Sequence, residues 1–105
     1  MNFTGMLKEG SLQDKVILIT GGGTGLGKSM GKYLVELGAK LIITSRRSEV
    51  IDNTANEFNK EYPDSTLAIQ GDVRKVEDVK RVLDKGYEKF KKIDILVNNA
   101  AGNFI

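Results

Sequence analysis

The sequence has 105 residues, of which 40% are hydrophobic and 29% are charged, and its net charge at pH 7 is +2. This length allows one domain at most, the composition is typical of a globular protein, and the weak positive charge gives little support to a nucleic-acid-binding protein. Cysteine and histidine are both absent, which excludes disulfides, the usual zinc sites and a histidine-based catalytic triad from this chain. We therefore expect neither a metal site nor a nucleic-acid partner.

Residues 1–13 have neither the apolar core of a secretory signal nor the arginine-rich character of a transit peptide. No apolar run approaches the roughly 20 residues that a membrane-spanning helix needs. We expect a cytoplasmic protein without a membrane segment, in which residues 1–13 form an N-terminal extension.

Short apolar runs then alternate with helical patterns along the chain. Strands without a polar face are predicted at residues 16–20, 41–44, 67–71 and 93–97. The apolar faces of the three intervening helices are predicted to be Leu26, Met30, Leu34 and Leu37; Val50, Ile51, Ala55 and Phe58; and Val76, Val79, Leu83 and Phe90. Gly38 is suited to end the first helix, and Ser48 to cap the second.

This β-α-β-α-β-α-β order predicts an α/β fold, a doubly wound parallel sheet of the Rossmann type, with strand order 3-2-1-4 by analogy. Four strands and three helices make up only the N-terminal portion of such a fold. We therefore expect residues 14–105 to be the dinucleotide-binding portion of a longer protein, truncated before the catalytic half. A complete small domain is the alternative.

The first predicted strand runs directly into a glycine-rich turn, TGGGTGLG at residues 20–27, and a helix begins within it. Glycines allow a backbone to turn sharply and to approach a pyrophosphate, while the helix N-terminus offers free N–H groups. A flexible loop is the alternative, but the strand before the turn and the helix after it favour dinucleotide binding. The predicted cofactor-binding residues here are Gly21, Gly23, Thr24, Gly25, Leu26 and Gly27.

The second strand is followed by Ser45, Arg46 and Arg47. A site selective for NAD has an acidic residue near this point, which accepts a hydrogen bond from the ribose 2′-hydroxyl. Guanidinium groups suit a 2′-phosphate instead, so the sequence favours NADP(H) as the cofactor. The alternative is that both arginines are solvated loop residues.

Three motifs in the expected order resemble those of the short-chain dehydrogenase/reductase family: T-G-x-x-x-G-x-G at residue 20, Asp72-Val73, and N-N-A-A-G at residue 98, which has one alanine more than the family's N-N-A-G. The resemblance runs from about Asp14 to the end of the chain. It implies that Asp72 binds the adenine amino group, with Val73 beside the ring. It also implies that Asn98, Ala100, Ala101 and Gly102 lie along the cofactor. The alternatives are that Asp72 caps the turn into the third helix and that Asn98 ties neighbouring strands together.

Longer matches resemble the 2,4-dienoyl-CoA reductases of that family: GGGTGLGK at residue 21, Ser-Arg at 45, Asp-Val-Arg at 72 and NNAAGNF at 98. The resemblance implies that Arg46 meets the 2′-phosphate of NADP(H), that Arg74 and Phe104 line the acyl-CoA site, and that Asn103 lies near the thioester. Otherwise, Arg74 is a surface residue at a helix start and Phe104 belongs to the core.

The resemblance implies NADPH-dependent reduction of a 2,4-dienoyl-CoA to an enoyl-CoA, in fatty acid metabolism, by a complete protein that forms a homotetramer. Its catalytic serine, tyrosine and lysine would lie beyond Ile105, so no catalytic residue is expected in this chain. Tyr87 and Lys91 have the spacing of the catalytic pair, but they precede the fourth strand, so we reject them. The alternatives are a 3-oxoacyl-carrier-protein reductase, a trans-2-enoyl-CoA reductase and a non-catalytic NADP-binding module.

Overall fold

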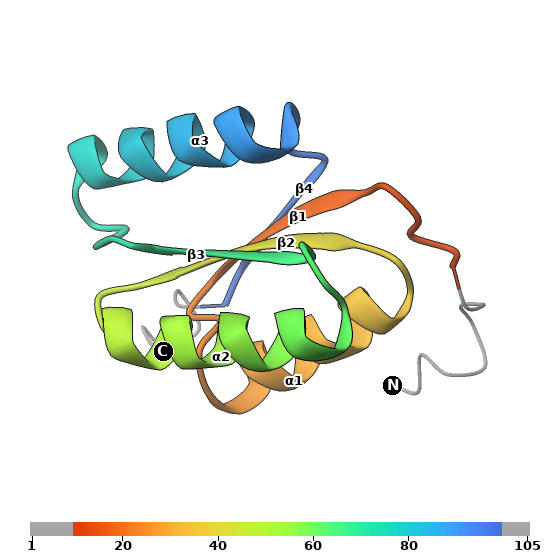
Figure 1. The fold of residues 1–105 in the computed structure, drawn as a ribbon. Coiled ribbons are helices and arrows are strands. Elements are labelled where there is room, and N and C mark those ends of the chain that lie inside the picture. Colours follow the sequence, from red (N-terminus) through yellow and green to blue (C-terminus); the bar gives the residue numbers. More distant parts are fainter. Residues whose placement is uncertain (1–9, 100–105) are drawn as a thin grey trace.

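The computed structural model describes residues 10–99, which form a four-stranded parallel sheet with helices on both faces (Figure 1). The elements are β1 (Val16–Thr20), α1 (Gly25–Glu36), β2 (Lys40–Ser45), α2 (Ser48–Glu61), β3 (Thr66–Gln70), α3 (Val76–Phe90) and β4 (Ile95–Asn98). The strand order is β3-β2-β1-β4. These findings confirm the predicted fold class and strand order.

Helices α1 and α2 cover one face of the sheet and α3 lies on the other (Figure 1). Side chains alternate between the two faces along a strand. In β1, Ile17 and Ile19 belong to the core beneath α1 and α2, whereas Val16 and Leu18 belong to the core beneath α3. Both faces of β1 are therefore covered, which explains why this strand has no polar face.

Glycines, rather than the predicted apolar stripes, mark where α1 and α3 approach the sheet. The buried residues are Gly27, Gly31 and Val35 in α1 and Val82 and Gly86 in α3. A Cβ on Gly31 would lie 3.3 Å from side chains of β2 and α2, and one on Gly86 would lie 2.5 Å from a β2 side chain. The predicted helix faces were therefore partly wrong: Leu26 is 71% exposed and Val76 is 82% exposed.

Several predicted boundaries also differ from the structure: β2 extends one residue further at each end, β3 begins and ends one residue earlier, and β4 ends one residue later than predicted. Strand β4 begins two residues later than predicted, because Asp94 pairs with β1 partly through its side chain: its N–H donates to the Val16 carbonyl and its Oδ2 accepts from the Val16 N–H, each at 2.8 Å. The hydrogen bond from the Val16 N–H is the main cause that lowers the pKa of the Asp94 carboxyl, and the hydrogen bond from Lys92 is the next. Ser48 is the first residue of α2 rather than its cap, which is Arg47.

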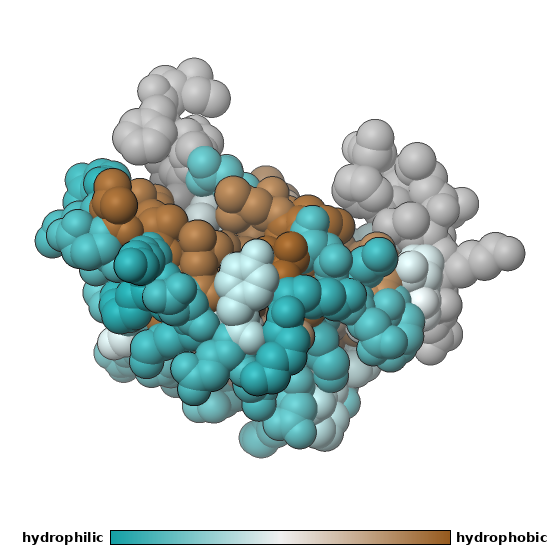
Figure 2. Space-filling model, turned by 90° about the horizontal axis from the view of Figure 1, so that it is seen from above, coloured by the Kyte–Doolittle hydropathy of each residue, from teal (hydrophilic) through white to brown (hydrophobic). Residues whose placement is uncertain are grey.

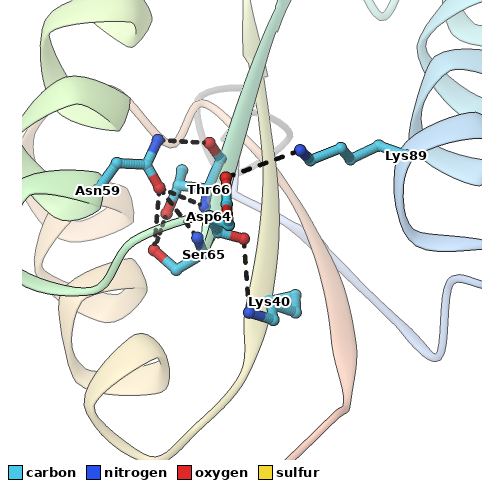
Figure 3. Close-up of polar contacts among 6 residues, drawn as sticks. All are labelled: Lys40, Asn59, Asp64, Ser65, Thr66 and Lys89. Carbon is cyan, nitrogen blue, oxygen red and sulfur yellow. Dashed lines mark hydrogen bonds and ion pairs between the residues drawn. The ribbon is translucent and has the colours of Figure 1, made fainter.

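Strand β3 lies at an edge of the sheet, and side chains occupy part of that edge. The Asn59 amide donates to the Thr66 carbonyl at 2.9 Å, and Asn59 Oδ1 accepts from the Thr66 N–H at 2.9 Å (Figure 3). Asn59 thus pairs with Thr66 as a neighbouring strand would. At the other end of β3, Arg81 donates to the Gln70 carbonyl at 2.7 Å. Exposed strand edges invite pairing with other chains, and these contacts reduce that tendency.

Candidate functional site

A cleft of about 1030 Å³ opens at the carboxyl ends of the strands. Strands β2 and β3 are added on one side of β1 and β4 on the other side, so the strand order switches between β1 and β4. Ligands of open α/β folds bind at such a point. The predicted residues that line the cleft are Gly21, Gly23, Thr24, Leu26, Ser45, Arg46, Arg47, Asp72, Val73, Arg74 and Asn98. Gly25 and Gly27 stand among them at the start of α1. Ala100, Ala101, Gly102, Asn103 and Phe104 lie outside the described residues.

Two hydrogen bonds hold the glycine-rich turn in place at Gly21, which has a φ of 71°. The Gly21 N–H donates to the Thr44 carbonyl at 2.8 Å, and its carbonyl accepts from the Asn99 side-chain amide at 3.1 Å. A Cβ on Gly27 would collide with the Gly21 carbonyl oxygen. Residue 27 must therefore be glycine if α1 is to begin directly against the turn.

The next part of the turn packs against α2. The Gly23 carbonyl accepts a buried hydrogen bond of 2.8 Å from the Thr54 hydroxyl. A Cβ on Gly23 would lie 2.7 Å from Val50 Cγ1. This glycine is thus needed for close packing within the protein, whatever ligand the turn holds.

Gly25 differs from these glycines, because the space beside it is empty. Its φ is +56°, and nothing lies within 4 Å of the position that a Cβ would take. Thr24, the N-cap of α1, makes no side-chain capping hydrogen bond, and the first turn of α1 has no acidic residue. The first N–H groups of a helix need partners and attract anions. The turn therefore fits the pyrophosphate of a dinucleotide.

Ser45, Arg46 and Arg47 form one wall of the cleft, at the end of β2. Ser45 Oγ accepts from the Arg47 N–H at 3.1 Å and so shapes the turn into α2. Both arginine residues are exposed, and neither forms an ion pair within residues 10–99. The charge of Arg46 is one of the smaller causes that lower the pKa of Asp72. The cleft therefore offers guanidinium groups to an anion at this end.

Asp72 follows β3, and its carboxylate is held by Arg74. Arg74 Nε and backbone N–H both donate to Asp72 Oδ1 at 3.0 Å, and Arg74 Nη2 donates to Oδ2 at 2.9 Å. The side-chain hydrogen bonds from Arg74 are the main reason that the pKa of the Asp72 carboxyl lies far below its usual range. Asp72 shapes the turn before α3, but the N-cap of that helix is Lys75.

Asn98 ties β4 to β1, because its Oδ1 accepts from the Thr20 hydroxyl at 3.0 Å. Sequence reasoning missed several residues of the site, among them Asn99 and Thr44. The Asn99 amide holds Gly21, and its place within the N-N-A-A-G motif could have indicated it. The Thr44 hydroxyl is buried at the cleft and has no hydrogen-bond partner within the part of the chain that the structure describes. Nothing in a buried apolar strand could have indicated that.

The opposite wall of the cleft is apolar and comes from β1, α3 and β4. Its side chains are Leu18, Val79, Val82, Leu83 and Leu96. Figure 2, which looks down on the α3 side of the molecule, shows a group of apolar side chains exposed at the surface next to polar side chains. Tyr87, also on α3, does not line the cleft.

Within residues 10–99, no group of three or more histidine, cysteine, aspartate or glutamate side chains is placed to hold a metal ion. In the same range, no helix is long and apolar enough to cross a membrane.

The chain is similar to several curated proteins over most of its length. It is 44% identical over 101 residues to a probable 2,4-dienoyl-CoA reductase of Caenorhabditis elegans named as producing (3E)-enoyl-CoA. It is 39% identical over 94 residues to a peroxisomal 2,4-dienoyl-CoA reductase of Arabidopsis thaliana, and 35% identical over 94 residues to a probable Bacillus subtilis enzyme named as producing (2E)-enoyl-CoA. These matches cover 95%, 90% and 90% of this chain, but only 33%, 31% and 37% of the relatives. The chain thus spans about a third of their length.

Solved structures agree with the fold. A 3-ketoacyl-(acyl-carrier-protein) reductase from Brucella melitensis, complexed with NADH, matches 82% of this chain with a TM-score of 0.76 and 38% identity; the match covers 34% of that protein. The C-domain of a bacterial malonyl-CoA reductase, with NADP, matches 83% of this chain with a TM-score of 0.77 and 28% identity, and 14% of that protein.

These similarities agree with the glycine turn, the strand order and the cleft at the carboxyl ends of the strands. The sequence model of the short chain dehydrogenase family matches residues 15–104, which is nearly the whole chain. The protein belongs to the short-chain dehydrogenase family, whose members use NAD(H) or NADP(H).

Proposed function

We propose that the complete protein uses NADPH to reduce a 2,4-dienoyl-CoA to an enoyl-CoA. The observation that carries this proposal is the 44% identity, over 95% of the chain, to a relative named as a probable 2,4-dienoyl-CoA reductase. The motif NNAAGNF at residues 98–104 adds to it, because it resembles the motif of the 2,4-dienoyl-CoA reductases at this point of the chain.

The pyrophosphate of the cofactor is proposed to lie against the N-terminus of α1. Thr24 and Gly25 leave the first N–H groups of the helix without a capping side chain, and the space beside Gly25 is open. Because α1 has no acidic residue in its first turn, no carboxylate there repels the phosphates. The proposed cofactor site also includes Ala100, Ala101 and Gly102.

Arg46 and Arg47 favour NADP(H) over NAD(H). A guanidinium pairs with a phosphate through two parallel hydrogen bonds, and a carboxylate at this point would repel it. The similar solved structures contain NADH in one case and NADP in another, so the family as a whole does not decide the preference. The arginines of this chain carry the proposal.

When bound, NADPH supplies the hydride. The residues that line the cleft are proposed to bind the nucleotide. Val79, Leu83 and Leu96 give the cleft an apolar wall, which would shield one side of the bound nucleotide from water. Asn103 and Phe104 are proposed to contact the thioester and the acyl chain, and Arg74 to pair with a phosphate of CoA. The proton donor and the groups that stabilise the thioester oxygen are proposed to belong to the remaining polypeptide.

We further propose that residues 1–13 form an N-terminal extension and that the complete protein is a cytoplasmic homotetramer. The A. thaliana relative is named as peroxisomal. The relatives are named for two different products, (3E)-enoyl-CoA and (2E)-enoyl-CoA.

A second candidate is reduction of a 3-oxoacyl thioester, which the 38% identity to the B. melitensis reductase favours. To decide between them, the complete polypeptide is given NADPH with a 2,4-dienoyl-CoA, a 3-oxoacyl thioester or a 2-enoyl-CoA, and NADPH oxidation is followed. We expect turnover with the dienoyl substrate. Turnover with only another thioester would refute the substrate, and tight NADPH binding without any turnover would indicate a non-catalytic module.

A further inference from the structure

We infer that Arg74 is a positioning residue of the nucleotide site: it fixes the Asp72 carboxylate so that one oxygen faces the 6-amino group of adenine. This inference rests on the proposed function, because it needs a dinucleotide in the cleft. It differs from the role in acyl-CoA binding that the family resemblance implies for Arg74.

The contacts of the pair set the orientation of the carboxylate. Arg74 uses the side edge of its guanidinium, Nε and Nη2, to hold Asp72 Oδ1 and Oδ2 at 3.0 and 2.9 Å, and its backbone N–H adds a third hydrogen bond of 3.0 Å to Oδ1. With both oxygens bound by one planar group, the carboxylate cannot rotate freely. The orientation of Asp72 is therefore set before any ligand arrives.

One position on the carboxylate remains for a ligand. An ionised carboxylate has about four lone-pair sites for hydrogen bonds. Arg74 occupies two on Oδ1 and one on Oδ2, which leaves one site on Oδ2. Because the pairing keeps Asp72 ionised, this site accepts a donor such as an amino group and disfavours an acceptor such as a carbonyl.

The main chain of Asp72 is held separately. Its N–H donates to Asp78 Oδ2 at 2.8 Å, and its carbonyl accepts from the Lys75 N–H at 2.9 Å. The turn therefore keeps its path when the Arg74 side chain is changed, and only the carboxylate loses its support. The Arg74 side chain is 62% exposed, so its replacement leaves no cavity in the core.

Arg74 can hold Asp72 and still contact an acyl-CoA. A guanidinium has five N–H donors, and two of them bind Asp72. Three donors remain for a phosphate of CoA. A lysine at this position would keep the charge but lose the fork that holds both carboxylate oxygens.

The test measures the dissociation constants of NADPH and of its deamino analogue, in which hypoxanthine replaces adenine and a carbonyl replaces the 6-amino group. The complete polypeptide is compared with its variants Arg74→Lys, Arg74→Ala, Asp72→Ala and the double variant Asp72→Ala/Arg74→Ala. Lys75→Ala is the matched control, because it removes a positive charge from the neighbouring residue of the same turn. The KM for the acyl-CoA substrate is measured in parallel.

The wild type and Lys75→Ala are expected to prefer NADPH over the analogue by about tenfold or more, since a hydrogen bond to a charged group is lost with the analogue. Both Arg74 variants and Asp72→Ala should reduce this preference to about threefold or less, and the double variant should reduce it no further. If Arg74→Lys retains the preference, or if Arg74 variants raise only the KM for acyl-CoA, the inference is overturned. If the wild type binds neither nucleotide, the proposed function itself has failed.

Discussion

Replacing Gly25 with valine separates the cost of a strained backbone from the loss of a phosphate site. Gly25 has a φ of +56°, where an L-residue costs about 1–2 kcal/mol, and more if it is β-branched. The new side chain meets no protein atom within 4 Å of its Cβ. It would occupy the space in front of the first N–H groups of α1. Losing two hydrogen bonds to a charged phosphate, each contributing about 1.5–3 kcal/mol, weakens NADPH binding roughly a hundredfold or more.

Gly10→Val is the matched control for this substitution. Gly10 has a φ of +76°, nothing within 4 Å of its Cβ position, and no place in the lining of the cleft. Both variants should lower the midpoint of thermal unfolding by a similar few degrees, but only Gly25→Val should weaken NADPH binding in a calorimetric titration. Equal affinities of the two variants for NADPH would refute the placement of the pyrophosphate at α1.

Three further changes have separate expected outcomes. Arg46→Ala should weaken NADPH binding by about 10- to 100-fold and NADH binding by about threefold or less, because only NADPH has the 2′-phosphate; equal losses in a fluorescence titration would remove Arg46 from that role. Asn59→Ala should lower the free energy of unfolding by about 1–3 kcal/mol, measured by urea unfolding, and promote concentration-dependent association through the β3 edge. Asn56→Ala, which changes an exposed residue of the same helix, should do neither. Stability should fall as the pH drops below about 4, because the pKa values of Asp72 and Asp94 are lowered in the folded state, so the unfolded state takes up protons first. Asp94→Asn should reduce the difference between the unfolding midpoints at about pH 7 and at about pH 3. An unchanged difference would contradict this account of Asp94.

Local patterns were enough to predict the architecture. Apolar runs such as residues 16–20 have no polar face because both faces of the strand are covered, and this property can be read from the sequence itself. The glycine turn is likewise recognisable, since the strand before it and the helix after it are both local features.

Contacts between distant residues could not be predicted in this way. The Gly31 and Gly86 positions become buried because side chains of β2 lie directly against them, so the apolar residues along each helix predicted the buried face only in part. The pairing of Asn59 with Thr66 and of Asp94 with Val16 uses side chains in place of a neighbouring backbone, which no periodicity indicates.

In the site, too, some features could be predicted from the sequence and others could not. Motif spacing predicted that Arg46 and Asp72 lie at the ends of neighbouring strands, and both line the cleft. It did not predict that Arg74 binds Asp72, because the motif fixes the order of the residues but not the direction in which a long side chain points.

The crystal structure of the complete polypeptide with NADPH tests the central claim most directly. We expect the pyrophosphate oxygens within hydrogen-bond distance of the backbone N–H groups at Gly25 to Gly27, and the 2′-phosphate against Arg46. A nucleotide bound away from the N-terminus of α1, or a 2′-phosphate directed away from the end of β2, would contradict the account.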